Sequence, residues 1–247
     1  MNKLYNGDCL EIMPTLEEKS VDMILCDLPY GRTNNRWDTV IPFDDLWKSY
    51  NRVIKENGVI ALFADGLFMA ELMLSNKKYW RYNLIWDKVM SSGFLNANRQ
   101  PLRQHEEVVI FYKKQPTYNP QKKRGRKNHS KGKEKEVANN NYNKFGFVDN
   151  HEALGEMKHP TSIVPFSKPH PSTMLHPTQK PIELLEWLIK TYTNKGDLVL
   201  DNCMGSGSTG VACSQTGRNF IGIEKDEKYF NIAKERIDAE MAQMRFL

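Results

Sequence analysis

The chain has few cysteines, and their positions give no framework. Four cysteines are spread over 247 residues without a C-x-x-C pair: Cys9, Cys26, Cys203 and Cys213. Such wide separation argues against a disulfide scaffold and against a cysteine zinc site. We expect reduced thiols that pack mostly in the interior.

Long apolar segments are also missing. No stretch approaches the roughly 18 uninterrupted apolar residues of a membrane span, and the polar start MNKLYNGDCLE is not a secretory signal. Hydrophobic residues make up 40% of the chain and charged residues 26%, values close to those of soluble globular proteins. These features predict a soluble, cytoplasmic protein with no membrane partner.

Histidine and tryptophan give no sign of a metal or ligand site. Five histidines lack the spacing of metal ligands: His105, His129, His151, His159 and His170. We therefore predict no bound metal. Four tryptophans lie within apolar patterns: Trp47, Trp80, Trp86 and Trp187. We expect these indole rings in the core.

The positive charge is concentrated in one segment. Ten cationic residues fall between positions 113 and 135: Lys113, Lys114, Lys122, Lys123, Arg124, Arg126, Lys127, Lys131, Lys133 and Lys135. Glu134 is the one acid there, so the segment carries +9; because the whole chain carries +5, the rest must carry −4. An acidic body with a basic, Gly/Asn/Pro-interrupted segment favours a polyanion partner, although a solvated loop is the simpler alternative.

The pattern of apolar residues predicts a doubly wound α/β fold. Buried strands are expected at residues 21–26, 59–63, 84–86 and 108–112, with helices near 43–56 and 66–75. After an aperiodic stretch, we expect a helix at 182–192, strands at 197–201 and 219–224, a helix at 209–216 and a last helix from about 226. The sequence thus predicts one α/β domain, formed by residues 1–112 and 176–247 and interrupted by a basic, loop-rich insert at 113–175.

A Gly-rich turn joins the expected strand at 197–201 to the expected helix at 209–216. In DNCMGSGSTG, Gly205 and Gly207 lie between a strand and a helix, where backbone N–H groups can approach a ligand. The next strand ends in Glu224, whose carboxylate could accept both ribose hydroxyls of an adenosine ligand. The alternative is a tight turn and a surface glutamate that caps the last helix. The turn fits neither G-x-G-x-x-G nor a phosphate-binding P-loop.

The tetrapeptide Asp27-Leu28-Pro29-Tyr30 ends the strand VDMILC. The Asp27 carboxylate and the Leu28 carbonyl could accept the two N–H bonds of an exocyclic base amine, while Tyr30 stacks on the base. Such acceptors would favour a pyramidal nitrogen whose lone pair can attack an electrophile. The alternative is an ordinary strand-ending turn that carries Asp and Pro.

Four segments in this order resemble the amino-methylating DNA methyltransferases: Asp27-Leu28-Pro29-Tyr30, HPTQKP at 176–181, DNCMGSGST at 201–209 and IGIE at 221–224. The family pattern has a D-P-P-Y motif, a Gly-rich F-x-G-S-G-type motif and the H-P-T-Q-K-P lead-in. Because the catalytic motif precedes the cofactor motif, the order resembles the β class, and intervening stretches resemble bacteriophage and prophage adenine enzymes. Leu28 replaces the first proline of the motif, and Cys203 replaces the aromatic residue that usually packs on the cofactor's adenine.

The resemblance implies a Rossmann-like methyltransferase sheet and the cofactor S-adenosylmethionine. It assigns the catalytic role to Asp27, Leu28, Pro29 and Tyr30. It places the following residues at the cofactor: Asp8, Cys9, Asp27, His176, Thr178, Lys180, Asn202, Met204, Gly205, Ser206, Gly207, Glu224 and Lys225.

Among these residues, the resemblance places Asp8 at the cofactor's adenine amine and Glu224 at its ribose. It places His176, Thr178 and Lys180 at the amino-acid end. Asp8 could instead cap a helix, and His176 could be a plain loop residue before a helix opened by Pro181.

DNA contacts are expected after the catalytic loop and in the insert, the latter as a target recognition region. The candidates are Arg32, Arg36, Trp37, Lys122, Lys123, Arg124, Arg126 and Lys127. Trp37 could equally be a core residue.

The sequence therefore predicts a site-specific adenine N6-methyltransferase that flips its target base out of double-stranded DNA. The resemblance leaves a homodimer and a cognate restriction endonuclease open as partners. Cytosine N4 or RNA methylation, and a catalytically silent DNA-binding protein on the same fold, are the alternatives.

Overall fold

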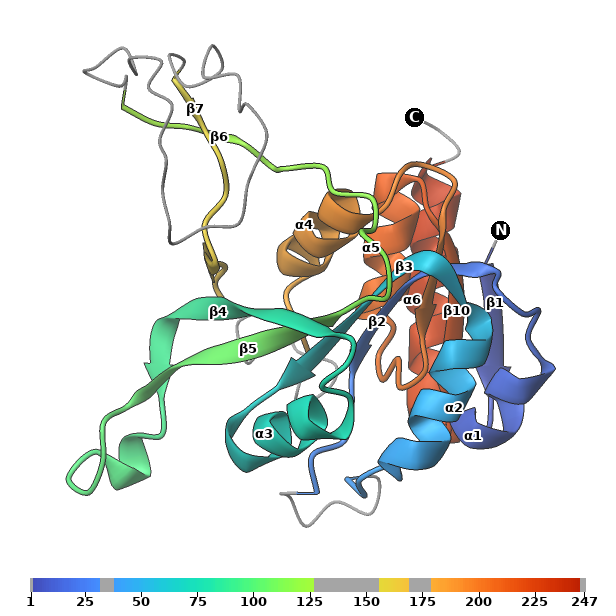
Figure 1. Cartoon of the computed structure of the whole chain (residues 1–247), viewed down its shortest axis with the longest axis horizontal. Helices are drawn as coiled ribbons and strands as arrows, with labels where there is room; N and C mark the ends of the chain where they lie inside the picture. The colour runs from blue at the N-terminus through green and yellow to red at the C-terminus, as the bar shows by residue number, and fades with distance from the viewer. Residues whose placement is uncertain (1, 32–37, 127–155, 169–178, 245–247) are drawn as a thin grey trace. The chain divides into compact units, whose positions relative to one another are not determined.

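The computed structural model describes residues 2–31, 38–126, 156–168 and 179–244, and the chain forms two compact units, Met1–Asn119 with Ser162–Leu247 and Pro120–Thr161. The larger unit holds an eight-stranded sheet in the order β1-β10-β9-β2-β3-β5-β4-β8 (Figure 1). Its strands are β1 (Asn2–Asn6), β2 (Val21–Asp27), β3 (Ile54–Ala64), β4 (Trp80–Ser92), β5 (Arg103–Phe111), β8 (Ile163–Pro165), β9 (Leu198–Asp201) and β10 (Asn219–Glu224).

Most neighbouring strands of this sheet are parallel. Strand β5 runs antiparallel to both of its neighbours, β3 and β4, whereas the pairs from β1 to β3 and the pair β4–β8 are parallel. From β2 the chain crosses to β3 on one side, and from β9 it crosses to β10 on the other side. The sheet therefore has a switch point between β2 and β9, where ligands bind at the carboxyl ends of the strands.

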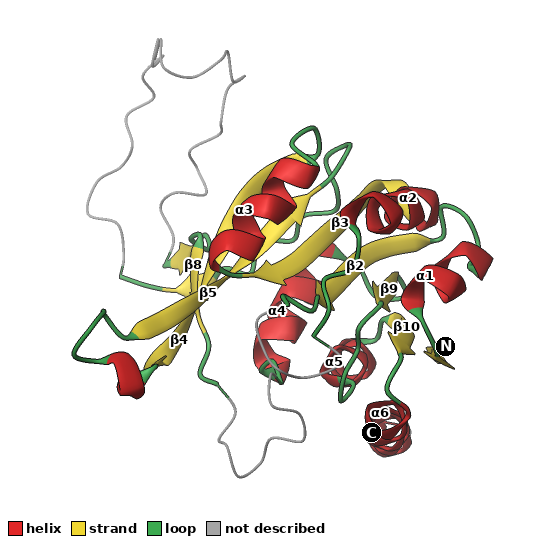
Figure 2. Cartoon of the chain, turned by 90° about the horizontal axis from the view of Figure 1, so that it is seen from below, coloured by secondary structure: helices red, strands yellow, loops and turns green. Residues whose placement is uncertain are grey.

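Helices cover both faces of the sheet. They are α1 (Cys9–Ile12), α2 (Phe43–Val53), α3 (Gly66–Ser75), α4 (Ile182–Tyr192), α5 (Ser208–Thr216) and α6 (Glu227–Met244), with short 3-10 turns η1 (Met13–Thr15) and η2 (Phe94–Asn96). Figure 2 shows α1, α2 and α3 on one face and α4, α5 and α6 on the other. The doubly wound α/β architecture is thus confirmed.

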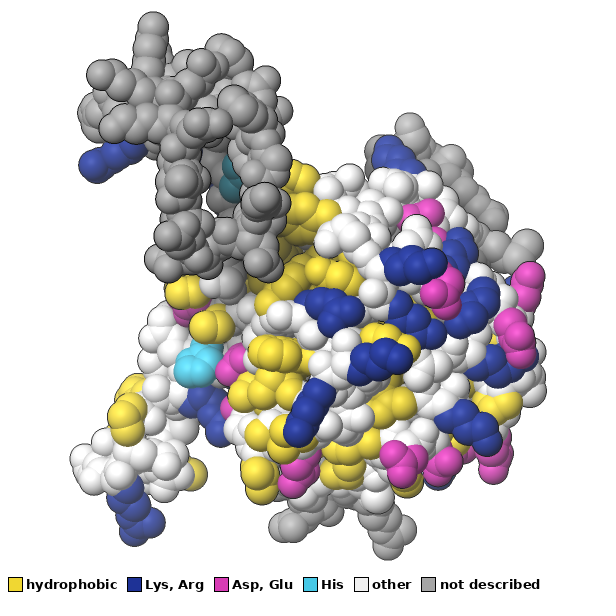
Figure 3. Space-filling view, in the orientation of Figure 1, with side chains coloured by type: hydrophobic (Ala, Val, Ile, Leu, Met, Phe, Trp, Pro, Cys, Tyr) yellow, Lys and Arg dark blue, Asp and Glu magenta, His cyan; other side chains and the backbone are white. Residues whose placement is uncertain are grey.

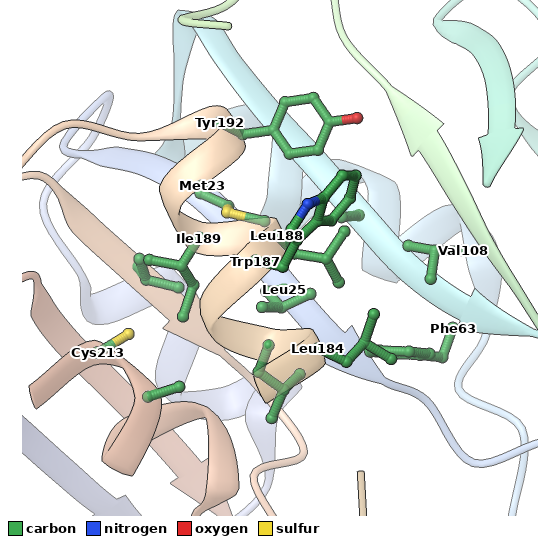
Figure 4. Close-up of a cluster of buried hydrophobic side chains, with 14 of the residues drawn as sticks. Met23, Leu25, Phe63, Val108, Leu184, Trp187, Leu188, Ile189, Tyr192 and Cys213 are labelled. Carbon is green, nitrogen blue, oxygen red and sulfur yellow. The ribbon is translucent and has the colours of Figure 1, made fainter. Parts of the chain in front are cut away.

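Two hydrophobic cores follow from the alternation of side chains along β2. Met23 and Leu25 point into a core shared with α4, α5 and α6, whereas Ile24 and Cys26 point into a core shared with α1, α2 and α3. Figure 4 shows the α4 side chains, among them Leu188, packed toward Met23 and Leu25. Because both faces of the strand are buried, β2 reads as a continuous apolar run.

The predicted elements exist, but several boundaries differ. Strand β4 extends well beyond 84–86 and β5 begins at Arg103, because the two strands continue as a hairpin whose side chains are mostly exposed and show no apolar periodicity. The helix expected over 43–56 ends at Val53, where Ile54 takes up extended geometry and starts β3. The short strands β1 and β8 were not predicted. Trp80 is 41% exposed and donates to Asn83, so its expected core position is wrong, whereas Trp47, Trp86 and Trp187 are buried.

The smaller unit, Pro120–Thr161, covers fewer residues than the predicted insert of 113–175. Its described part forms a two-stranded antiparallel sheet of β6 (Lys123–Arg124) and β7 (Met157–Lys158). Residues on either side belong to the larger unit, where Asn119 N donates to the Thr191 carbonyl of α4 and Ile85 N donates to the Ser162 carbonyl. Backbone pairing, which the aperiodic sequence does not reveal, sets these limits.

The surface of the larger unit mixes both signs of charge. In Figure 3, lysine and arginine side chains alternate with aspartate and glutamate on the face shown. Within the described residues, no helix has the length and apolar character needed to cross a bilayer.

Candidate active site

A cavity of about 680 Å³ opens at the carboxyl ends of the parallel strands. Asp27 ends β2, Asp201 ends β9 and Glu224 ends β10, and all three line the cavity. This volume lies in the range of small-molecule sites. The switch point of the sheet thus brings together the two motifs that the sequence places about 170 residues apart.

Asp27 is held by two donors. The Tyr30 hydroxyl donates to Oδ1 over 2.9 Å, and Lys180 Nζ donates to Oδ2 over 2.6 Å. Each carboxylate oxygen has two lone pairs, so both can still accept a bond from a substrate. The Lys180 ammonium thus lies on the catalytic candidate. Lys180 also lines the cavity, so its predicted place at the cofactor's amino-acid end stays a prediction.

The aromatic ring of the tetrapeptide is packed against the protein. Tyr30 stacks on Phe68 with ring centroids 4.8 Å apart, and burial raises the pKa of its hydroxyl well above the ordinary value. Leu28 is buried, so the residue that replaces the first proline of the motif serves as a core side chain. Pro29 lines the cavity beside them. Stacking of Tyr30 on a base stays a prediction.

A second carboxylate faces Lys180 from strand β5. Glu106 Oε2 lies 3.4 Å from Lys180 Nζ, and Glu106 Oε1 lies 2.5 Å from Lys88 Nζ. Burial would raise the pKa of Glu106, but the ammonium groups of Lys180 and Lys88 lower it to about 2. Burial would likewise lower the pKa of Lys180, but Asp27 and Glu106 raise it above the ordinary value. Both charges are therefore present at neutral pH.

The Gly-rich turn owes its second glycine to helix packing. Gly207 has φ +80°, and a Cβ there would lie 2.8 Å from the Cβ of Ala233 in α6. Arg236, also in α6, donates to the Ser206 carbonyl and, over 3.0 Å, to the Ser206 hydroxyl. Met204 N donates to the Ile223 carbonyl. The turn is thus fixed by α6 and β10 before any ligand binds.

Glu224 braces both the turn and the last helix. Its Oε2 accepts from Gly205 N over 2.8 Å and its Oε1 accepts from Asp226 N over 2.9 Å. Burial raises the pKa of this carboxyl group above the ordinary value. Glu224 thus holds the turn that leads into α6, but it is a half-buried residue rather than the surface cap of the alternative. The ribose role stays a prediction that uses the remaining lone pairs.

Asp8 also has the structural role that was its alternative. As N-cap of α1 it accepts from Leu10 N over 2.9 Å, and it pairs with the exposed Lys225 at 2.9 Å. The hydrogen bond from Lys225 is the main cause that lowers the pKa of Asp8. Both residues line the cavity beside Gly7, so their predicted cofactor contacts remain geometrically open.

A group of thiols occupies the place of the missing aromatic ring. Cys203 lies in contact with Cys9 and Cys26. The contact with Cys203 and burial raise the pKa of Cys9, and burial raises the pKa of Cys26 against its contact with Cys203. The contact with Cys26 and burial raise the pKa of Cys203. All four cysteines are free, as predicted. Asn202 donates to the sulfurs of Cys9 and Cys203 and accepts from the Tyr50 hydroxyl over 2.5 Å. The side chain of Asn202 is thus hydrogen-bonded within the core; because Asn202 also lines the cavity, its cofactor contact stays a prediction.

The chemistry of the cavity fits the predicted cofactor at its acidic end. Three carboxylates line this end of the cavity: Asp8 before α1, Asp201 at the end of β9 and Glu224 at the end of β10. Carboxylates there can accept hydrogen bonds from the hydroxyl and amine groups of an adenosine moiety. Among the other candidates, His176, Thr178, Arg32, Arg36, Trp37 and Lys127 lie outside the described residues. Lys122, Lys123, Arg124 and Arg126 belong to the smaller unit, where Arg124 pairs with Glu156 at 2.6 Å.

Sequence reasoning missed Glu106 and Lys88, although one signal existed. Leu84 and Trp86 are buried at alternate positions of β4, and Lys88 continues the same face. A lysine on a buried strand face requires a counter-charge, since an unpaired buried ammonium is very costly. Glu106, opposite Trp86 on β5, is that counter-charge.

The fold and the two motifs at its edge define a methyltransferase. The sequence model of the DNA methylase family matches residues 21–235, and the chain belongs to this N6/N4 family. The chain is 29% identical to the type II methyltransferase M1.MboII of Moraxella bovis, with 94% of this chain and 95% of the relative covered. It is 27% identical to M.HpaI of Haemophilus parainfluenzae, with 96% and 74% covered.

Solved structures agree with this membership. The crystal structure of the M1.HpyAVI–SAM complex matches with a TM-score of 0.66 and 26% identity, covering 96% of this chain and all of the relative. The cytosine-N4-specific PvuII DNA methyltransferase matches with a TM-score of 0.69 at 15% identity, covering 98% and 92%. The second likeness is one of fold.

Replacement of Glu224 by alanine separates its two roles. We expect S-adenosylmethionine binding to weaken by about 1.5 to 3 kcal/mol, the scale of a charge-assisted hydrogen bond. Because Asp226 N also loses its acceptor, the free energy of unfolding should fall by about 1 kcal/mol. Titration calorimetry and urea unfolding measure the two effects. Asp226→Ala, which removes another cap of α6, is the control; equal cofactor affinity in Glu224→Ala and wild type would exclude the ribose role.

Asp201 should make stability depend on pH. Burial raises its pKa to about 6, against the hydrogen bonds from Thr209 and Cys203 that lower it. Because the raised pKa penalises the ionised form, this residue should favour the folded state more as the pH falls from about 7 toward 4. In Asp201→Asn the gain in unfolding free energy between pH 7.5 and pH 5 should be about 1 kcal/mol smaller than in wild type. Urea titrations at both pH values test this, and parallel curves for the two proteins would refute it.

Proposed function

We propose that this protein methylates the N6 amine of adenine at specific sites in double-stranded DNA. The carrying observation is the Asp27 carboxylate at the cavity wall, next to the Gly-rich turn. The cofactor is S-adenosylmethionine, the methyl donor of this family, and M1.HpyAVI was solved with it. An aspartate rather than a serine at the first position of the tetrapeptide favours adenine over cytosine. The narrower resemblance to bacteriophage enzymes stays a prediction.

The chain's residues prepare the exocyclic nitrogen for attack. Asp27 and the Leu28 carbonyl accept its two N–H bonds, which directs the nitrogen lone pair toward the methyl group that the cofactor supplies. Lys180 donates to Asp27 and so holds the carboxylate in position. The nitrogen gains positive charge as it is methylated, and the carboxylate stabilises that charge.

The target base must leave the duplex to reach this cavity. Base flipping costs a few kcal/mol, which contacts to the DNA backbone offset. We assign such contacts to the basic strand β6 and its neighbours in the smaller unit, which would then act as the target recognition region. A cognate restriction endonuclease and a homodimer are further proposals, the first supported by the type II names of M1.MboII and M.HpaI.

The test is methyl transfer in vitro with nucleoside analysis. Purified protein, labelled S-adenosylmethionine and unmethylated genomic DNA should give N6-methyladenine after digestion, with RNA of equal length as the control substrate. N4-methylcytosine would replace the adenine proposal by the cytosine one. A protein that binds DNA but neither binds the cofactor nor transfers methyl would be a silent DNA-binding member of the fold.

A further inference from the structure

A row of four charged side chains begins at the cavity wall with Asp27, and base binding by Asp27 and Leu28 does not involve the last two of them, Glu106 and Lys88. From β2 to β4 the row runs Asp27, Lys180, Glu106, Lys88, with neighbouring atoms 2.6, 3.4 and 2.5 Å apart. The signs alternate along it. Glu106 lies between the two lysines of the row, and it is on β5 opposite Trp86.

Both lysines of the row are buried and lie over aromatic rings. Lys88 is 1% exposed, with Nζ 5.5 Å from the centroid of Trp86, and Lys180 Nζ lies 4.9 Å from the centroid of Phe63. A buried ammonium is stable only with a matching charge, because its desolvation is otherwise uncompensated. Glu106 gives that charge to both.

The Oε2 atom of Glu106 accepts no hydrogen bond within the described part of the chain. Its contact with Lys180 is therefore an ion pair without a hydrogen bond, and Lys180 directs its hydrogen bond to Asp27 instead. Lys168, an exposed residue at the cavity, adds a third cation near the row, and the Tyr30 hydroxyl faces Asp27 from the other side.

We propose that Glu106, held by Lys88, is a positioning residue for methyl transfer: it keeps the Lys180 ammonium against Asp27 and offsets its charge beside the reacting nitrogen. The inference rests on the proposed role of Asp27. It assigns a function to a residue outside the catalytic tetrapeptide and the Gly-rich turn.

The charge balance explains why the site needs a second acid. Lys88, Lys168 and Lys180 all interact with Glu106, and Lys180 interacts with Asp27 as well. Without Glu106, Asp27 would be the one direct ion-pair partner of Lys180 within the described residues, at the place where the target nitrogen becomes positive. Glu106 thus lets Lys180 orient Asp27 without cancelling the negative potential that the nitrogen requires.

Glu106→Gln tests this with an almost isosteric side chain. We expect kcat to fall by about tenfold or more, with KM for DNA and the dissociation constant of S-adenosylmethionine within about twofold of wild type. The alkaline limb of the kcat profile should move to lower pH by about one unit, because burial of Lys180 is then opposed by Asp27 alone. Glu106→Asp should restore part of kcat.

Glu107→Gln is the matched control. Glu107 is the next residue on β5 and points to the other face, where it accepts from Asn83 over 2.7 Å. This variant should keep the wild-type pH profile. Equal profiles for Glu106→Gln and wild type, or the same shift in both variants, would overturn the proposal.

The double variant Lys88→Met, Glu106→Gln covers the case in which the single variant folds poorly. It removes one charge of each sign and should recover thermal stability. A profile that stays shifted in this stable protein supports positioning, whereas full recovery of kcat and of the alkaline limb shows a merely structural role and overturns it. If wild type transfers no methyl group to DNA, the proposed function fails first; an active wild type with an insensitive Glu106 refutes this inference alone.

Discussion

Replacement of Asp27 by alanine is expected to reduce kcat for methyl transfer at least about a thousandfold, while S-adenosylmethionine binds within about tenfold of wild type. The variant removes the acceptor for the reacting amine. It also leaves Lys180 Nζ facing the cavity with Glu106 as its partner, so a wall that accepted hydrogen bonds becomes one that donates them. Single-turnover assays with labelled cofactor measure the chemical step apart from product release.

The control for Asp27 lies on the same strand. Asp22 pairs with Lys55 at 2.7 Å near the amino end of β2, far along the strand from the cavity. Asp22→Asn should keep turnover within about threefold of wild type. If Asp27→Ala turns over as fast as this control, the catalytic assignment of the tetrapeptide is wrong.

Removal of the basic cluster should weaken DNA binding about a hundredfold and flatten its salt dependence. The variant changes Lys122, Lys123, Arg124, Arg126 and Lys127 to glutamine. If four or five of these side chains contact phosphates, the wild-type slope of log affinity against log salt is near −4, and most of it should disappear. Binding should weaken on all sequences alike, and cofactor affinity should stay unchanged. Fluorescence anisotropy at several salt concentrations gives both quantities.

A second five-residue variant separates local contacts from net charge. Exposed lysines of the larger unit, each changed to glutamine, give the same loss of charge: Lys3, Lys48, Lys77, Lys195 and Lys228. This control should reduce affinity only slightly. Wild-type affinity and slope in the first variant would make the cluster a solvated loop, and the DNA-facing surface would then be sought near Arg32, Arg36 and the segment from Arg99 to Arg103.

The sequence predicts those site residues whose position follows from topology. Asp27 and Glu224 end strands, and strand ends of a parallel sheet meet at one edge, so their common cavity could be inferred before the fold was known. Contacts made by long side chains could not. Lys180 lies next to the helix-opening Pro181 and reaches Asp27 only because α4 starts beside β2, and no spacing in the sequence specifies that reach.

The sequence did not predict the boundaries of β4 and β5 for a different reason. Their distal halves pair with each other while most side chains on both faces are exposed, Val89 and Met90 among them, so no period of two in hydrophobicity marks them. Lys88 and Glu106 lie where this exposed hairpin joins the buried sheet. A charged side chain that continues a buried face was the available signal, and its partner had to come from the neighbouring strand.

The pairing of β1 with β10 joins the first strand of the chain to the last. During synthesis, β1 leaves the ribosome before its partner strand exists, because more than two hundred residues separate the end of β1 from the start of β10. Asp8, which follows β1, and Glu224, which ends β10, come together at the cavity only then. A nascent or truncated chain that ends before β10 lacks Glu224 and cannot complete the cavity, so we expect methyl transfer only after β10 has been added.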